Sequence, residues 1–144
     1  MMISTLKEIE LEDIAIICNY LNDEARNNGV VTDPFSVSSN VEFLIKDRTN
    51  GSYKIEDDGI IVAFIIYEKH RYENTLAHFY VDPKYRTYRS VMIPLHSKLV
   101  EEFKGKRLYY RKLHNKVDAI THYANNGEID LIALSDYVSR IKGV

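Results

Sequence analysis

The stretch from Thr75 to Phe103 constrains the fold more than any other part of the chain. Its first part, up to Val81, is rich in β-branched and aromatic residues and predicts a strand, and Asp82-Pro83 ends that strand because proline cannot donate to a sheet ladder. The stretch therefore predicts a strand, a charged turn and an amphipathic helix that needs a sheet to pack on. The apolar stripe of that helix is Met92, Leu95, Leu99 and Phe103.

The turn between this strand and helix has the properties of an anion site. The first amides of a helix have no partner within the helix, and the macrodipole is positive at that end. Lys84, Arg86 and Arg89 add full positive charges to the same turn. We therefore expect the turn to bind a negatively charged group.

Four residues of the turn also follow a known spacing. Val81, Pro83, Tyr85 and Arg86 match Val-x-Pro-x-Tyr-Arg just before the predicted helix. This pattern resembles the cofactor loop of the GNAT superfamily of acetyl-CoA-dependent N-acetyltransferases. The resemblance implies a mixed, twisted α/β sheet with flanking helices and splayed central strands. It also implies acetyl-CoA as co-substrate and an amine as acceptor.

The chain departs from the family loop at three positions that are glycine or alanine in the family. Thr87, Arg89 and Val91 stand there instead. Because glycine permits positive φ and a close approach of the backbone to a pyrophosphate, these side chains are expected to narrow or reshape the loop. Pro94 lacks an amide and biases Ile93 away from helical angles, so the helix is expected to begin later than in the family.

A second landmark lies further along the chain. Asn115, Ala119, Tyr123 and Gly127 fill the spacing Asn-x-x-x-Ala-x-x-x-Tyr-x-x-x-Gly. This resembles the GNAT helix whose tyrosine lies near the cofactor sulfur and often protonates the departing thiolate. The resemblance, which covers roughly residues 52–127, therefore makes Tyr123 the candidate catalytic residue. The alternative is a tyrosine that packs on the sheet with its hydroxyl satisfied.

The resemblance also predicts where the cofactor binds. Main-chain groups of the strand would hold the pantetheine arm, and the turn would hold the pyrophosphate. The alternative for Arg86 and Arg89 is a solvated basic turn. The predicted cofactor-binding residues are Phe79, Tyr80, Val81, Arg86, Thr87, Tyr88, Arg89, Ser90, Val91 and Asn115.

The sequence does not assign a general base. Glu73 precedes the strand, near where many relatives carry a carboxylate, but Thr75 occupies the better-aligned position and cannot accept a proton. His78 alternates with Phe79 and is either a cleft residue or a structural histidine. The base is therefore left open.

The first half of the chain predicts a strand, two helices and a hairpin. A strand over 3–9 and a helix over 10–26 come first, and the pattern Ser39-x-x-Glu42 resembles a capping box before a short second helix. Asp58-Gly59 is a two-residue hairpin signal between strands over 52–57 and 60–69.

The second half predicts the rest of a single domain over 1–144. A strand over 107–113 should pair in parallel with the strand over 75–81, and the helix opened by Asn115 should follow it. A strand over 129–133 and a terminal helix capped by Ser135-Asp136 end the chain. The sheet is expected to hold about six strands.

Composition narrows the function classes. The 144 residues carry a net charge of -2 and one cysteine, Cys18, which fits a buried filler in a reducing compartment. The longest apolar run, 60–67, is far shorter than the ~20 residues of a membrane span, and no signal peptide is recognisable. No Cys/His metal spacing is present. We therefore expect a cytoplasmic protein without a metal, and the sequence leaves a homodimer open.

Two other functions remain open. One is a catalytically inactive GNAT-like domain that uses the fold for binding, in an accessory role such as a phage-encoded one. The other is a nucleic-acid module, because tyrosines and cations interleave in the turn and around 107–112. Strand alternation would bury half of the latter residues, so nucleic acid is not the expected partner. The expected partner is a small-molecule or protein amine.

Overall fold

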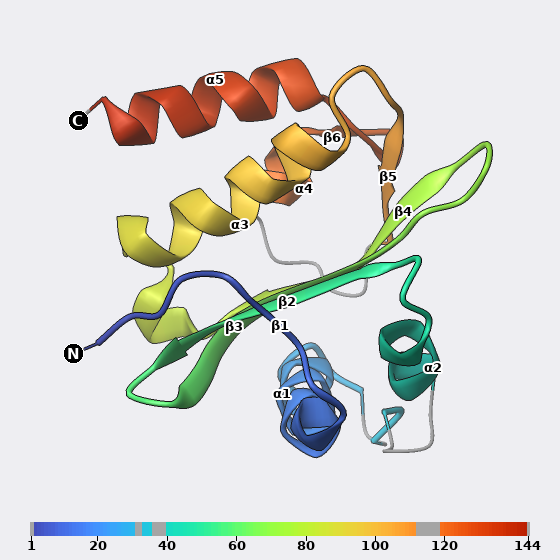
Figure 1. Ribbon diagram of the computed structural model, residues 1–144, viewed down its shortest axis with the longest axis vertical. Helices are drawn as coiled ribbons and strands as arrows, with labels where there is room; N and C mark the ends of the chain where they lie inside the picture. Colours follow the sequence, from blue (N-terminus) through green and yellow to red (C-terminus); the bar gives the residue numbers. More distant parts are fainter. Residues whose placement is uncertain (1, 31–32, 36–39, 112–118, 144) are drawn as a thin grey trace.

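The structure, a computed structural model, describes residues 2–30, 33–35, 40–111 and 119–143. It is a sheet between two helical layers, with α1 and α2 on one face and α3, α4 and α5 on the other (Figure 1). The helices are α1 Ile14–Asn27, α2 Asn40–Lys46, α3 Arg89–Glu102, α4 Ala119–His122 and α5 Leu131–Lys142. The strands are β1 Lys7–Glu8, β2 Gly51–Asp57, β3 Ile60–Glu68, β4 Asn74–Val81, β5 Leu108–Tyr110, β6 Ala124–Asn125 and β7 Glu128–Ile129.

The described strands form one mixed sheet in the order β1-β2-β3-β4-β5-β7-β6. The α/β architecture predicted from the sequence is confirmed, with seven strands where about six were expected. The additional strand is β6, which pairs with β7 around a turn in which Asn126 and Gly127 both have positive φ. In the described residues, the helix that the sequence predicted to open at Asn115 is present as α4 and ends at His122.

The central hairpin forms where the sequence predicted it. Asp58 and Gly59 have φ of 52° and 84°, and positive φ at both central residues is what a two-residue type I′ turn requires. β3, which follows, is buried from Ile61 to Tyr67 and pairs with β2 and β4. A continuous apolar run thus becomes the centre of the sheet, because helices cover both of its faces.

The N-terminal strand is shorter than predicted. In the described residues the segment pairs with β2 through β1 and one isolated bridge, between Ile3 and Asp57, and single backbone hydrogen bonds join Ser4 to Glu56 and Ile9 to Ser52. α1 then packs on the sheet through its apolar stripe. Lys54 of β2, which is 7% exposed, reaches Asp13 before α1 with an Nζ to Oδ2 distance of 2.6 Å. The predicted second helix is present as α2, whereas Ser39 of its proposed cap lies outside the described residues.

β4 and β5 run parallel and separate early. In the described residues they form three pairs at the start of β4, the last being Leu76 with Tyr110, and the Arg111 amide then donates to the Leu76 carbonyl. The rest of β4 pairs with β3 alone among the described strands. The predicted parallel pairing and splay are therefore confirmed. β5 covers only part of the predicted strand over 107–113, of which residues 112 and 113 lie outside the description.

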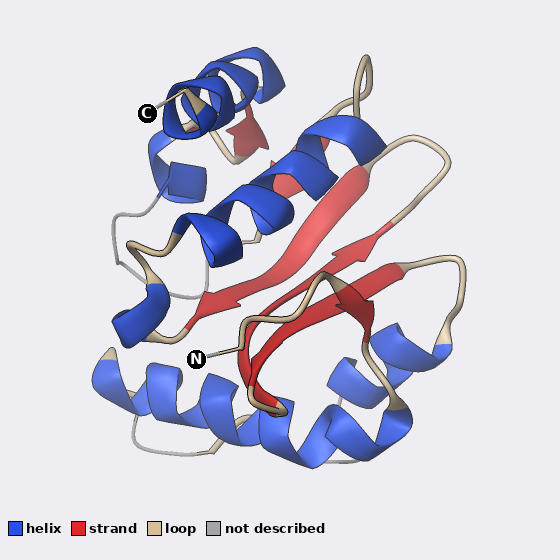
Figure 2. Ribbon diagram, turned by 60° about the vertical axis from the view of Figure 1, so that its left-hand side comes forward, coloured by secondary structure: helices blue, strands red, loops and turns tan. Residues whose placement is uncertain are grey.

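α3 begins at Arg89, so the expectation of a late start was wrong. Pro94 lies inside the helix rather than before it. The position is tolerated because Pro94 stands only a turn and a half into the helix, where its missing amide removes a single bond to the first turn. Figure 2 shows α3 lying along the sheet on the face opposite α1 and α2.

The C-terminal segment differs most from the prediction. The predicted strand over 129–133 ends at Ile129, and α5 begins at Leu131. The cap of α5 is Asp130, whose carboxylate accepts from the amides of Ile132 and Ala133 at 3.1 and 3.0 Å. The predicted cap at Ser135-Asp136 is instead part of the helix, because the earlier aspartate already satisfies the first amides.

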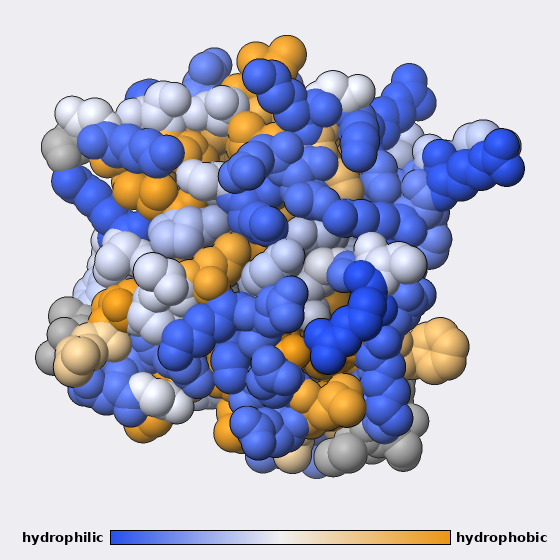
Figure 3. All heavy atoms as spheres, viewed as in Figure 1, coloured by the Kyte–Doolittle hydropathy of each residue, from blue (hydrophilic) through white to orange (hydrophobic). Residues whose placement is uncertain are grey.

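Two clusters of buried side chains hold the layers together. One joins the sheet to α3 and α5, and the other joins the sheet to α1 and α2. On the face seen in Figure 3 hydrophilic residues predominate, and apolar side chains show through in small patches. No helix in the described residues is long and apolar enough to cross a membrane.

Candidate functional site

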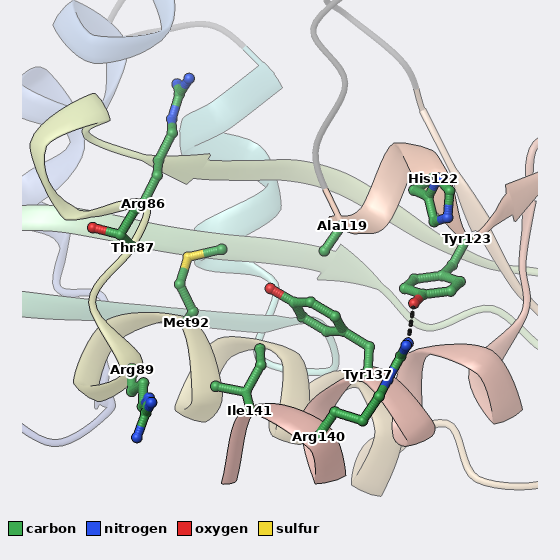
Figure 4. Close-up of a pocket in the computed structure, with 10 residues that line it drawn as sticks. All are labelled: Arg86, Thr87, Arg89, Met92, Ala119, His122, Tyr123, Tyr137, Arg140 and Ile141. Carbon is green, nitrogen blue, oxygen red and sulfur yellow. Dashed lines mark hydrogen bonds between the residues drawn. The ribbon is translucent and has the colours of Figure 1, made fainter. Parts of the chain in front are cut away.

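A cleft of about 710 Å³ opens between the start of α3, α4 and α5 (Figure 4). The turn before α3 and its first residues form one wall, α4 a second and the end of α5 a third. None of the described residues that line the cleft is acidic. The lining residues are Arg86, Thr87, Arg89, Met92, Ala119, His122, Tyr123, Tyr137, Arg140 and Ile141.

The turn that forms the first wall is a short 3-10 helix, Pro83–Tyr85, tied down at both ends. The carboxylate of Asp82 accepts from the Lys84 amide at 3.0 Å, and the Tyr85 hydroxyl donates to Asp57 Oδ2 at 2.6 Å. This hydrogen bond raises the pKa of Tyr85 to about 12 and lowers the pKa of Asp57. The matched tyrosine of the GNAT pattern thus anchors the turn to the β2-β3 hairpin.

The three substituted loop positions point in different directions. Val91 is fully buried in the core beneath α3, whereas Thr87 and Arg89 are exposed and line the cleft. None of the three has positive φ, so the backbone here does not require glycine. The substitutions therefore add side chains to the cleft at two positions, without straining the loop.

Main-chain donors are available beside those side chains. The Tyr88 carbonyl accepts from the amides of Val91 and Met92 at 3.1 and 2.9 Å. The amides of Thr87 and Ser90 donate to no residue in the described part of the chain. These two amides and the positive end of the α3 dipole make the first wall suitable for an anion.

Arg86 lies at the edge of the cleft but its guanidinium points away from it (Figure 4). Its Nε donates to the carbonyl of Val81 at 3.0 Å, and its Nη2 lies 3.6 Å from Glu24 Oε1 on α1. The side chain therefore bridges the turn to the opposite layer. Its predicted role as a phosphate ligand stays a prediction that requires the side chain to turn.

The three strand residues predicted to bind the cofactor direct their peptide groups to two different sides of β4. The Asp82 amide donates to the Val62 carbonyl of β3, so by alternation Tyr80 also directs its peptide groups to β3. The main chain of Phe79 and Val81 then faces the side from which β5 has diverged. This is the edge to which a pantetheine arm would add. The Tyr80 ring stacks on Phe64 in the α1 layer, and its burial raises the pKa of its hydroxyl.

Tyr123 directly follows α4 and borders the cleft. Arg140 of α5 donates from Nη2 to the Tyr123 hydroxyl oxygen at 2.8 Å. The Tyr123 ring is tilted against the Tyr137 ring, with centroids 5.9 Å apart. The Tyr137 ring contacts the buried ring of His96 in α3 at a centroid distance of 5.4 Å. The His96 ring in turn contacts Phe79 of β4 at 5.0 Å. A row of rings thus connects the cleft to the splayed edge of β4.

The candidates for a general base do not meet at the cleft. Glu73 is exposed before β4, and His78 is buried on the α1 face with its ring edge-on to Phe35. Asn115 lies outside the described residues. Among the described residues no cluster of His, Cys, Asp or Glu has the arrangement of a metal site.

Sequence reasoning missed the wall made by α5. Tyr137, Arg140 and Ile141 line the cleft, although the sequence predicted a terminal helix without any role in a site. Tyr137 and Ile141 are spaced by one helical turn with Arg140 beside them, and this pattern is also what any amphipathic helix shows. The sequence pattern of this helix therefore does not distinguish a helix that lines a cleft from one that packs in the core.

Comparisons with known proteins identify the fold. No protein-family model matches the chain, and no curated protein has a significantly similar sequence. Among solved structures it is similar to an N-acetyltransferase from Staphylococcus aureus, with a TM-score of 0.60, 18% identity and 76% and 73% of the two chains covered. It is also similar to a PaiA N-acetyltransferase from Thermoplasma acidophilum in complex with coenzyme A. The TM-score is 0.59, the identity is 13%, and 90% and 96% of the two chains are covered.

A third similar structure is a GCN5-related N-acetyltransferase from Ralstonia eutropha, with a TM-score of 0.58, 13% identity and 78% and 84% of the two chains covered. The chain therefore has the GNAT fold that the two sequence landmarks predicted. At these identities the likeness establishes the fold and leaves activity to the residues of the cleft.

Proposed function

We propose, from the fold shared with the GNAT N-acetyltransferases, that the protein is an acyl-CoA-dependent N-acetyltransferase that acts on an amine. One observation carries this proposal: the cleft opens beside the start of α3, where main-chain amides can receive an anion, and Tyr123 borders the same cleft. An amine must attack a thioester carbonyl in this reaction, and the leaving thiolate must receive a proton.

The residues present fit coenzyme A. The amides of Thr87 and Ser90, together with Arg89, offer donors to phosphate oxygens at the start of α3. The main-chain groups of Phe79 and Val81 offer a strand edge to the amides of the pantetheine arm. Acetyl-CoA would supply the activated acetyl group, and this chain would bind and orient it.

Tyr123 is the residue that we assign as proton donor to the thiolate. Arginine can only donate hydrogen bonds, so the bond from Arg140 occupies a lone pair of the Tyr123 oxygen and leaves its O–H free to donate elsewhere. The hydrogen of that hydroxyl is the proton that the thiolate would take. The amine's proton requires a separate acceptor, which we leave unassigned.

The test measures binding and turnover separately. We expect calorimetry to give roughly micromolar affinity for acetyl-CoA. Tyr123→Phe should keep that affinity and lower thiol release over a panel of amines about a hundredfold, the lower end of general-acid effects. Tyr72→Phe is the matched control, because Tyr72 is 83% exposed and does not line the cleft. Absence of acetyl-CoA binding at millimolar ligand would contradict the proposal.

The second candidate is a GNAT-like domain without catalytic activity that uses the fold to bind. Two observations favour it: Arg86 is turned to Val81 and Glu24, and Thr87 and Arg89 add side chains where the family loop is small. Wild-type protein that binds coenzyme A and turns over no amine of the panel would favour this candidate.

A further inference from the structure

The side chain of Arg86 starts at the edge of the cleft, and its guanidinium lies outside it (Figure 4). We propose that Arg86 is a positioning residue, which holds the end of β4 at a fixed separation from the amides of Thr87 and Ser90 and does not itself bind phosphate. This inference rests on the proposed function, because those two segments are the two halves of the proposed coenzyme site. It also gives Glu24 of α1, which belongs to neither sequence landmark, a role in coenzyme binding.

The bond from Arg86 to Val81 connects the two halves of the proposed site. Val81 ends β4, and its main chain faces the side from which β5 has diverged, where the pantetheine arm would pair. The Val81 carbonyl accepts from Arg86 Nε at 3.0 Å. Thr87 directly follows Arg86 and carries one of the two amides that we propose for the phosphates. A single side chain therefore ties the end of the strand to the part of the turn that would bind phosphate.

Glu24 of α1 contacts the far end of the same guanidinium. Its Oε1 lies 3.6 Å from Arg86 Nη2, and Glu24 is only 8% exposed. If the guanidinium turned into the cleft, this buried carboxylate would lose an opposite charge, and such a loss is costly. The planar fork of arginine allows Nε to donate to Val81 while Nη2 faces the carboxylate. The contacts therefore favour the observed orientation of Arg86 over one that points at a phosphate.

A fixed separation between the two halves matters only to a ligand that spans both. Coenzyme A spans both, because its diphosphate would meet the amides of Thr87 and Ser90 and its pantetheine arm would meet β4. ADP and pantetheine would each occupy one half. When the chain is already held in the arrangement that the bound ligand requires, less ordering has to accompany binding. The tie made by Arg86 should therefore favour the whole coenzyme and have little effect on either fragment.

The experiment compares coenzyme A with ADP, which keeps the diphosphate, and with pantetheine, which has no phosphate. Titrations followed by NMR would measure all three on wild type and on Arg86→Met, which keeps the length of the side chain but removes its donors and its charge. We expect coenzyme A to weaken about tenfold, as loss of one hydrogen bond from a charged group does, and each fragment to change by less than about twofold. A thermal melt of each variant would show that the fold is intact.

Glu24→Gln gives a second test, in which the direction of the effect separates two roles of Arg86. If Arg86 positions the turn, loss of the Glu24 charge loosens the tie, and coenzyme A should weaken by about threefold. If Arg86 were a phosphate ligand held back by Glu24, the same variant would release it, and coenzyme A and ADP would both bind more tightly. The matched control is Glu12→Gln, which changes the net charge equally at an exposed residue that does not line the cleft and should leave affinity unchanged.

The ligand series decides between the inference and its alternatives. If Arg86→Met weakens ADP as much as coenzyme A, or if Glu24→Gln tightens both, Arg86 is a phosphate ligand and the inference is overturned. If it weakens pantetheine as much as coenzyme A, the effect is confined to the strand, which also overturns it. Equal affinity of wild type and Arg86→Met for coenzyme A overturns it as well. All of these results spare the proposed function, whereas wild type that binds no coenzyme A at millimolar ligand contradicts both.

Discussion

The effect of a side chain at a given position in this fold depends on what that position faces. Val91 replaces a small residue of the GNAT loop yet points into the core, so it costs the cleft no space. Gly51, in contrast, has no room for any side chain, because a Cβ there would overlap the Tyr67 ring across the β2-β3 pair. Tyr67 is fully buried between Tyr53 and Phe103, which limits how far its ring can move.

Gly51→Ala is therefore expected to destabilise the protein by about 1–3 kcal/mol, the usual range for overpacking a core. Urea denaturation followed by circular dichroism would measure the change in the free energy of unfolding. The control is the same substitution in a Tyr67→Val background, where the ring is absent and the additional cost should largely disappear. Equal costs in both backgrounds would show that the Tyr67 contact is not responsible.

Among the elements, α5 depends most on its first residue. Asp130 precedes the helix and accepts from two of its first amides, which have no partner within the helix. Asp136 lies inside the same helix and is exposed. Because α5 forms a wall of the cleft and packs on α3, its start determines where Tyr137 and Arg140 lie.

The two aspartates give a direct comparison of the observed and the predicted cap. Asp130→Ala should lower the free energy of unfolding by about 1 kcal/mol, and Asp136→Ala should change it by less than about 0.5 kcal/mol. Thermal or urea unfolding of the two variants would measure both. A larger loss for Asp136→Ala would mean that the helix begins where the sequence pattern first placed it.

Across the whole molecule, contacts between distant segments hold the cleft in position. The bond from Tyr85 to Asp57 joins the turn before α3 to the end of β2, and Arg86 joins the same turn to α1 through Glu24. The turn is therefore fixed by two layers at once. The bond between Tyr85 and Asp57 shifts the pKa of both of its groups, so its contribution to stability should depend on pH.

Tyr85→Phe should lower stability between about pH 5 and pH 10, and the difference from wild type should shrink outside that window. The bond lowers the folded-state pKa of Asp57, so its contribution is present above the usual carboxyl pKa and is lost as pH falls through the lowered value. It raises the pKa of Tyr85 to about 12, so the contribution is also lost as pH rises through that value. Urea unfolding across pH would test this, and a difference independent of pH would contradict it.

Much of the architecture was predictable because its signals are local. The Asp58-Gly59 turn, the apolar run of β3 and the helical stripe of α3 each depend on neighbours in sequence. The order strand, helix, strand predicted the parallel pair of β4 and β5, and the GNAT resemblance predicted their splay. The C-terminal segment was not predictable in this way. Asp130 and Asp136 are both acceptable caps, and pairing of Glu128 with Tyr109 of β5 decided between them.

The sequence alone determined that a strand, a turn with cations and a helix would follow one another, since periodicity and proline act over a few residues. Tertiary structure alone decided which partner each arginine of the cleft has. Arg86 turns to Glu24, 62 positions earlier in the chain by their numbers, and Arg140 comes to Tyr123 across 17 positions. A guanidinium donates to the acceptors that tertiary packing brings within reach, so its partner is set only when the layers of the fold pack together.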